Sequence, residues 1–193
     1  MEQLEKRLTS AHRKMLLKAA RKVIADRLNG EKGVVDMPED EVFSVRAATF
    51  VTLKISGRLR GCIGTLEPVV SLWQSVCDNA VNGAFRDRRF SPLSLGELDS
   101  VEIEISVLTP SVSLAYRDPS DLAEKLQPGI DGVTIGEGSR GATFLPQVWQ
   151  QLESPEQFLD QLCLKAGLEK TAWRERQLKV STYRVLCFKE DRG

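Results

Sequence analysis

The chain has 193 residues, of which 41% are hydrophobic and 28% are charged, a composition typical of a globular protein with an ordinary core. It carries 27 Lys and Arg and 27 Asp and Glu, so its formal net charge is zero and does not point to a polyanionic partner. No apolar run reaches the ~18 residues that cross a bilayer, and the charged N-terminus lacks the apolar core of a signal peptide, so we expect a cytoplasmic protein without a membrane partner.

The first predicted element is a basic helix over residues 9–29. Thr9 or Ser10 can cap its start, apolar residues such as Met15 recur at helical spacing, and Asn29-Gly30 supplies a left-handed stop. Basic residues outnumber acidic ones in and around this helix, which leaves nucleic-acid binding open as a function. A solvated helix face is the simpler interpretation.

Residues 30–41 are expected to form a surface loop, after which alternating residues predict a β-hairpin. Its first strand spans 50–55, Ser56-Gly57 provides the turn, and a second extended run covers 59–66. A helix with a broad apolar stripe is predicted over 71–84. The return strand of the hairpin contains the strongest candidate for a functional motif.

The cleanest predicted strand spans residues 101–107. Alternation places β-branched residues on one face and Glu102 and Glu104 on the other, which favours antiparallel pairing with one face covered. Two carboxylates on one face allow acid–base chemistry, but solvated sheet carboxylates are much commoner. Ser94 and Glu97 have the spacing of a capping box, which predicts a helical turn before this strand.

The C-terminal part is predicted to combine short strands and helices. The expected elements are a helix from Asp118-Pro119, strands over 133–135 and 142–145 around the glycine-rich stretch 136–141, a helical turn over 146–152, a helix from Ser154-Pro155 to Gly167 and one closing strand over 178–188. The order is not regularly βαβ, so we predict an α/β protein of the α+β kind, with a mixed, largely antiparallel sheet flanked by helices. We expect one domain over residues 1–193, and leave open two closely packed lobes, the second one smaller.

Four cysteines are scattered along the chain, at Cys62, Cys77, Cys163 and Cys187. In a reducing compartment such cysteines are usually free thiols packed as small hydrophobic residues. No pair has the close spacing of a zinc knuckle, and the single histidine, His12, is distant from all of them in sequence. We therefore expect no metal site, and no motif predicts a cofactor.

The segment Arg60-Gly61-Cys62-Ile63-Gly64 is the strongest candidate for chemistry. Glycines are costly in an extended segment and suit a bulge or a place where a backbone or a ligand approaches closely. Cys62 can be a buried structural residue, a ligand contact or a nucleophile whose thiolate Arg60 favours. The structural interpretation is the simplest, because no base lies near Cys62 in sequence and His12 belongs to a distant helix.

Two further segments have the composition of possible binding sites. Residues 85–92 place three arginines around Asp87, which suits either anion binding or a salt-bridged helix end. Residues 136–141 are rich in glycine but match neither a Walker loop nor a dinucleotide fingerprint, so a hairpin tip is expected there.

Several motifs, taken in order, resemble those of the AMMECR-type domain family. The matching residues are Leu59–Leu66 for its most diagnostic stretch, Asp87, Arg89, Phe90 and Pro92 for a D-x-R-F-x-P element, Gly129–Val133 and Phe144–Val148 for two central elements, and Phe158 through Leu168, Trp173 and the last strand for its end. The resemblance covers essentially the whole chain. It is closest to the bacterial form of the family, which is named for the AmmeMemoRadiSam system.

The resemblance implies an α/β body with a smaller lobe, a pocket near the signature, and partners of the Memo type and the radical SAM type. It implies no particular reaction. We therefore expect a ligand-binding or accessory component beside those partners, and the alternatives are a cysteine-dependent enzyme using Cys62 and a nucleic-acid-binding protein. The expected site binds a small anionic ligand and consists of Arg60, Gly61, Cys62, Gly64, Asp87 and Arg89.

Overall fold

The computed structural model describes residues 7–152 and 154–191 and divides the chain into two compact units. Unit 1 contains the chain up to Thr109 and again from Leu186, and unit 2 is Pro110–Val185. Each unit has its own four-stranded sheet and its own hydrophobic core. Among the described residues, no helix combines the length and the hydropathy needed to span a membrane.

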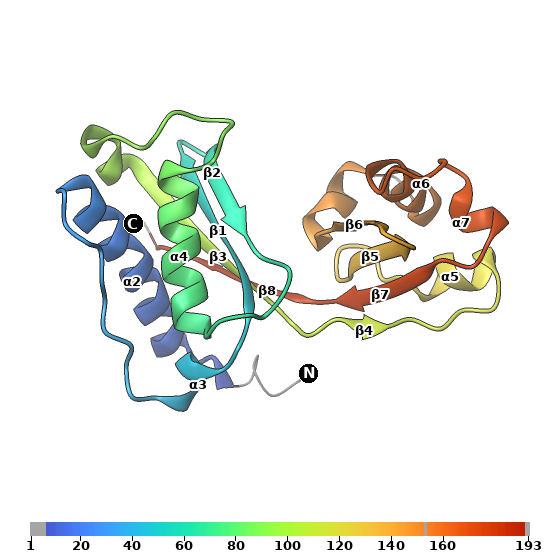
Figure 1. The fold of residues 1–193 in the computed structure, drawn as a ribbon, viewed down its shortest axis with the longest axis horizontal. Helices are drawn as coiled ribbons and strands as arrows, with labels where there is room; N and C mark the ends of the chain where they lie inside the picture. The colour runs from blue at the N-terminus through green and yellow to red at the C-terminus, as the bar shows by residue number, and fades with distance from the viewer. Residues whose placement is uncertain (1–6, 153, 192–193) are drawn as a thin grey trace. The chain divides into compact units, whose positions relative to one another are not determined.

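Unit 1 packs two long helices on one face of a sheet (Figure 1). Its elements are α2 (Ser10–Leu28), α3 (Glu41–Ser44), β1 (Ala48–Ile55), β2 (Arg58–Gly64), α4 (Leu72–Phe85), the 3-10 helix η1 (Leu95–Ser100), β3 (Val101–Leu108) and β8 (Val185–Lys189), with the strands in the order β2-β1-β3-β8. Alternate residues of the two central strands are completely buried in the core beneath the helices, among them Val51, Leu53, Ile103 and Ile105. The period-two pattern therefore predicted the covered face correctly.

The predicted basic helix is confirmed as α2. Thr9 caps it in a reciprocal box with His12, and Asn29 ends it, as its sequence indicated. Met15 was expected in the apolar stripe, but 38% of it is exposed to solvent. The buried stripe is narrower than the pattern suggested and excludes this residue.

The predicted hairpin is formed by β1 and β2. Ser56 and Gly57 both have positive φ, 50° and 75°, as a two-residue hairpin turn with the right-handed twist of the strands requires. The register shifts between Leu53, opposite Gly61, and Lys54, opposite Leu59. Arg60 is therefore an extra residue in β2, a β-bulge that redirects its side chain.

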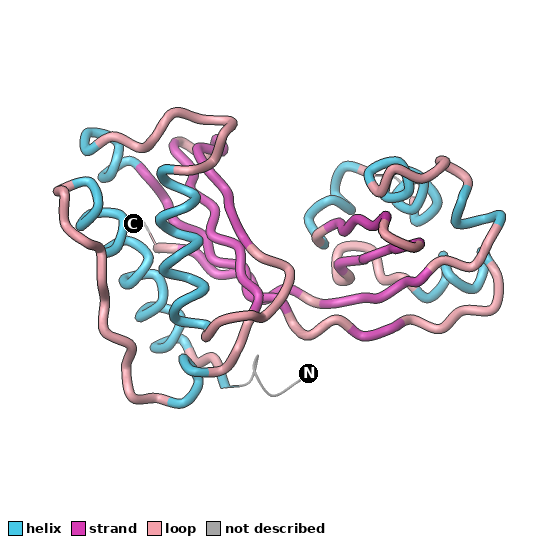
Figure 2. Tube along the Cα trace, viewed as in Figure 1, coloured by secondary structure: helices cyan, strands magenta, loops and turns pink. Residues whose placement is uncertain are grey.

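In unit 2, short helices pack beside a second antiparallel sheet (Figure 2). Its elements are β4 (Val112–Ser113), α5 (Pro119–Lys125), β5 (Gly132–Glu137), β6 (Arg140–Phe144), the 3-10 helix η2 (Pro146–Gln151), α6 (Pro155–Lys165), α7 (Ala172–Glu175) and β7 (Lys179–Tyr183), with the strands in the order β4-β7-β5-β6. The ring of Trp149 stacks on Phe158 with centroids 3.7 Å apart in its core.

The expected single strand over 178–188 is wrong. The segment forms two strands, since β7 pairs with β5 and β4 in unit 2, whereas β8 lies beside β3 in unit 1. Alternation continues through both strands, so the sequence pattern alone did not show the change of sheet. The predicted fold class is confirmed, with two antiparallel sheets flanked by helices in place of one.

Candidate functional site

The two glycines of the signature segment lie against atoms of the chain itself. A Cβ on Gly61 would be 2.2 Å from the carbonyl oxygen of Gly83 in α4, so only glycine lets this strand and helix approach so closely. A Cβ on Gly64 would be 2.2 Å from the ring of Phe50 on the neighbouring strand. Close approach of the backbone, one of the expected reasons for glycine, holds at both positions.

Both backbone polar groups of Cys62 are bound by side chains from the segment after α4. The strand β2 is the edge of its sheet, so these groups point away from β1. The Cys62 N–H donates to Asp87 Oδ2 at 2.9 Å, and Arg89 Nη2 donates to the Cys62 carbonyl at 3.2 Å. The D-x-R-F-x-P element therefore folds over the edge of the signature strand and fixes it.

Asp87 and Arg89 form a two-point ion pair. Arg89 Nε donates to Asp87 Oδ1 at 2.9 Å and Nη2 donates to Oδ2 at 2.7 Å. The Asp87 side chain is only 5% exposed and that of Arg89 is 57% exposed. Hydrogen bonds from Arg89, followed by those from the Cys62 and Arg89 backbone, hold the pKa of Asp87 well below its usual range against the opposing effect of burial.

Arg60 is held by a different carboxylate. Because of the bulge in β2, its guanidinium reaches Glu97 at 2.7 Å (Nε–Oε1) and 3.1 Å (Nη2–Oε2), and it also donates to the Ser91 carbonyl at 3.0 Å. Its side chain is 14% exposed. Both arginines of the expected anion site thus already contact carboxylates of the chain, and only Arg89 keeps a largely exposed face.

The thiol of Cys62 is on the sheet face opposite α4, because its neighbour Gly61 faces that helix. Thr52 lies directly across on β1 and donates from Oγ1 to Sγ at 3.2 Å. Arg89 also contacts this residue, through the hydrogen bond from Nη2 to the Cys62 carbonyl. As a residue, Cys62 is partly exposed.

The same sheet face carries polar residues that sequence reasoning did not place in a site. Glu104 of β3 lies opposite Thr52 and binds Lys54 Nζ at 2.9 Å. Ser106 lies 3.8 Å from the thiol of Cys187 on β8. Alternation assigns Glu104 to the polar face of its strand, but only the strand register brings Glu104 into one row with Thr52 and Cys62.

His12 is engaged elsewhere in unit 1. It takes part in the cap of α2, and its Nε2 lies 3.2 Å from Asp40 while its ring packs edge-on against Phe43. Over residues 7–152 and 154–191, no three His, Cys, Asp or Glu side chains are grouped so as to hold a metal ion.

The glycine-rich stretch 136–141 forms the expected hairpin tip between β5 and β6. Gly138 has φ +61°, and Glu137 next to it accepts hydrogen bonds from Arg140 and Arg176. These contacts explain the charged residues of the tip without a ligand.

Comparison with known proteins assigns the chain to a family. A family model described as AMMECR1 matches residues 17–188. A protein of Methanothermobacter thermautotrophicus is 37% identical over 179 residues, covering 91% of this chain and 93% of the relative, and one of the bacterium Aquifex aeolicus is 37% identical over 161 residues, covering 81% and 82%.

The fold is similar to a solved structure. The crystal structure of the uncharacterized protein PH0010 from Pyrococcus horikoshii aligns with a TM-score of 0.79 and 31% identity, covering 92% of this chain and 90% of that one. Archaeal and bacterial relatives both match, so the likeness does not single out the bacterial form. The family model and these relatives together show that the chain belongs to the AMMECR1 family.

Proposed function

We propose that this protein is a ligand-binding or accessory component that works in the cytoplasm beside Memo-type and radical SAM proteins. The observation that carries the proposal is the way Cys62 is held: its backbone is fixed by Asp87 and Arg89, while the residue stays partly exposed. The choice of partners rests on the resemblance of the motifs to the AmmeMemoRadiSam form.

A fixed backbone at an accessible face favours binding. Ordering a surface only when a partner arrives costs conformational entropy, and the contacts of Cys62 have already removed that cost in the free chain. The row formed by Cys62, Thr52 and Glu104 offers a thiol, a hydroxyl and a carboxylate on one rigid sheet. A rigid element holds such groups more accurately than a loop does.

The small ligand in this proposal is an anion beside Arg89. Arg60 is almost covered and uses its guanidinium on Glu97, whereas the Arg89 side chain is 57% exposed and keeps donors for a second partner. An anion there would contact Arg89 while the ion pair with Asp87 stays intact, next to the Cys62 thiol.

The proposal is tested by mixing the purified chain with a Memo-type protein and a radical SAM protein from the same source. We expect a complex by size-exclusion chromatography with light scattering. Arg89→Gln should weaken it about tenfold, the cost of one charge-assisted contact of about 1.4 kcal/mol. Arg140→Gln is the matched control, because Arg140 is 53% exposed and also pairs with a nearby carboxylate.

Two results would contradict this function. One is the absence of a complex with either partner, and the other is turnover of a metabolite by the purified chain alone. An equal loss of binding in the Arg89 and Arg140 variants would show that the partner does not contact the signature.

A cysteine-dependent enzyme using Cys62 is the second candidate, and the contact of the Arg89 guanidinium with Cys62 favours it. A nucleophilic thiol also needs a group that accepts its proton. The thiol accepts a hydrogen bond from the Thr52 hydroxyl, which is not a base at neutral pH, and the carboxylate in the same row, Glu104, lies one strand further away and is bound by Lys54. This candidate predicts turnover by the chain alone that Cys62→Ser abolishes.

A further inference from the structure

A separate cavity of about 490 Å³ lies in unit 1 between α2, α4 and the loop that follows α2. It shares no lining residue with the signature site. The lining includes Arg27 near the end of α2, Lys32, Val34 and Val35 of the loop, and Trp73, Val81 and Arg86 of α4 and its end. Its volume falls in the range of small-molecule sites.

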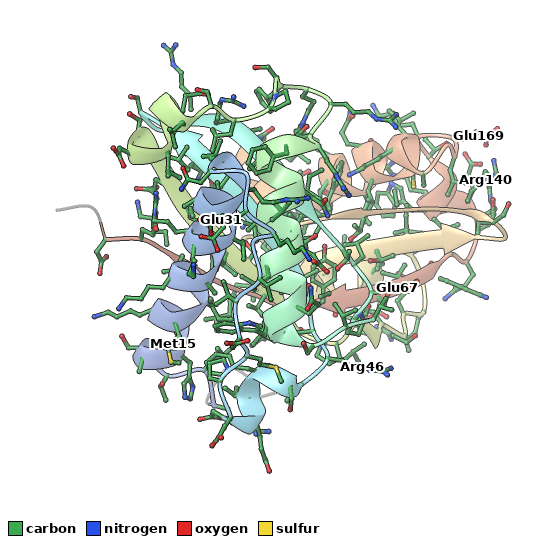
Figure 3. The ribbon with its side chains drawn as sticks, turned by 60° about the vertical axis from the view of Figure 1, so that its left-hand side comes forward. Met15, Glu31, Arg46, Glu67, Arg140 and Glu169 are labelled. Atoms are coloured by element: carbon green, nitrogen blue, oxygen red, sulfur yellow. The ribbon has the colours of Figure 1, made fainter. Side chains whose placement is uncertain are left out.

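The loop that closes this cavity is attached to both helices. Gly33 has φ +65°, and a Cβ there would lie 3.0 Å from the carbonyl oxygen of Val23 and 3.2 Å from Cγ of Arg27, so the loop rests directly on α2. Trp73 Nε1 of α4 donates to the Val35 carbonyl at 3.0 Å. Figure 3 shows this loop, with Glu31 at its start, passing along the two helices. The cavity is therefore built by fixed walls.

Three cations line the cavity without a carboxylate partner. Arg27, Lys32 and Arg86 are exposed and form no ion pair within the described residues. The one acidic residue in the lining, Asp78, accepts a hydrogen bond from Gln74 at 2.8 Å. Three like charges around one hollow give it a positive potential, which attracts an anion.

The ends of the two helices explain only part of this charge. Each helix C-terminus carries about half a negative charge, which favours Arg27 and Arg86 at those ends. Lys32 lies outside both helices and has no such reason to be there. Three cations and one carboxylate leave a surplus of positive charge even after the helix ends are counted.

We propose that this cavity binds a small organic phosphate. A phosphomonoester carries between about −1.5 and −2 charges near neutral pH, opposite in sign to the surplus, and its three oxygens can each accept from one of the three cations. The organic part would lie against Val34 and Val81, the apolar part of the lining. The inference does not depend on the function proposed for Cys62.

The experiment is a titration of the ¹⁵N-labelled full chain with phenyl phosphate, followed by NMR of the three indole N–H groups. The Trp73 indole reports on the cavity through its bond to Val35. The Trp149 and Trp173 indoles donate to Asp131 and Asp160 in unit 2 and serve as internal controls. We expect a saturable shift of the Trp73 signal alone, with a dissociation constant of about 1 mM or below.

Variants decide whether the cations bind the phosphate. Lys32→Gln and Arg86→Gln should each weaken binding at least about fivefold, while Arg88→Gln, two residues from Arg86 and outside the lining, should not. Benzyl alcohol should cause no saturable shift. The inference is overturned if phenyl phosphate causes no shift, if Arg86→Gln and Arg88→Gln have equal effects, or if benzyl alcohol binds equally well. Benzoate that binds as tightly as phenyl phosphate would also contradict it, because the ligand class would then be a carboxylate.

Discussion

Glu97 joins the signature strand to the start of η1 through one carboxylate. It accepts two hydrogen bonds from Arg60, and it accepts from both the backbone N–H and the hydroxyl of Ser94. The hydrogen bonds from Arg60, then those from Ser94, lower the pKa of Glu97 to about 2. A lowered pKa means that the folded state favours the ionised carboxylate.

Glu97 should therefore contribute to the pH dependence of stability. The contribution is present above the ordinary pKa of 4.5 and is lost as the pH falls from there toward about 2. We predict that Glu97→Gln lowers the free energy of unfolding at pH 7 by about 1 kcal/mol and reduces its fall between pH 4.5 and pH 3. Urea denaturation at these pH values measures both effects.

The control for that experiment is Glu67→Gln, which removes an exposed carboxylate of the same unit (Figure 3). It should leave the acid-induced loss of stability as it is in the unchanged chain. A Glu97→Gln variant with the pH dependence of the unchanged chain would show that the contacts of Glu97 do not stabilise the fold.

The signature strand β2 is held on two sides by other elements. Its glycine backbone contacts α4 at Gly83, and its outer edge is bound by Asp87 and Arg89 of the next segment. Such an edge is covered against pairing with another chain. The strand is thus a rigid support, and Cys62 is the part of it that remains available.

We predict that Gly61→Ala separates β2 from α4. The added Cβ would meet the Gly83 carbonyl at 2.2 Å, and a backbone oxygen moves only if the helix moves. The free energy of unfolding should fall by about 3 kcal/mol, at the upper end of the usual cost of overpacking. Chemical denaturation followed by circular dichroism measures it.

Gly96→Ala is the matched control, since a Cβ there has no atom within 4 Å. Its stability should stay within about 0.5 kcal/mol of the unchanged chain. Equal stability of the two alanine variants would mean that β2 and α4 do not need the close contact.

At the scale of the whole molecule, local patterns predicted most elements but not their assignment to sheets. The alternation in β1 and β3 and the turn at Ser56-Gly57 specify strand, face and hairpin together. The segment 178–188 has the same alternation, yet it divides between two sheets. Alternation shows that one side of a strand is buried, but it does not show which sheet the strand joins.

Only part of the candidate site was predictable, because local motifs do not specify how strands pair. The motifs singled out Cys62, Asp87 and Arg89, and the structure brings these three together. The place of Thr52 and Glu104 beside Cys62 depends on strand register, which a single sequence does not specify here. The contact between Arg60 and Glu97 depends on a bulge, which the glycines of this segment allowed as one alternative and which only the strand register places at Arg60.

The fold raises the pKa of three of the four thiols. Burial raises the pKa of the Cys77 thiol to about 12 and also raises that of Cys163. Cys187 is exposed as a residue, but burial of its thiol, followed by the charge of Glu104, raises its pKa as well. Alkylation at neutral pH should therefore occur first at Cys62.

The most direct test of Cys62 as a binding residue is its rate of alkylation by iodoacetamide at neutral pH, measured by mass spectrometry with glutathione as the reference thiol. We predict that Cys62 in the free chain reacts no faster than glutathione, and that the Memo-type and radical SAM partners slow the reaction about tenfold by covering its face. Alkylation faster than that of glutathione and unchanged by the partners would contradict a binding role and identify Cys62 as an activated nucleophile.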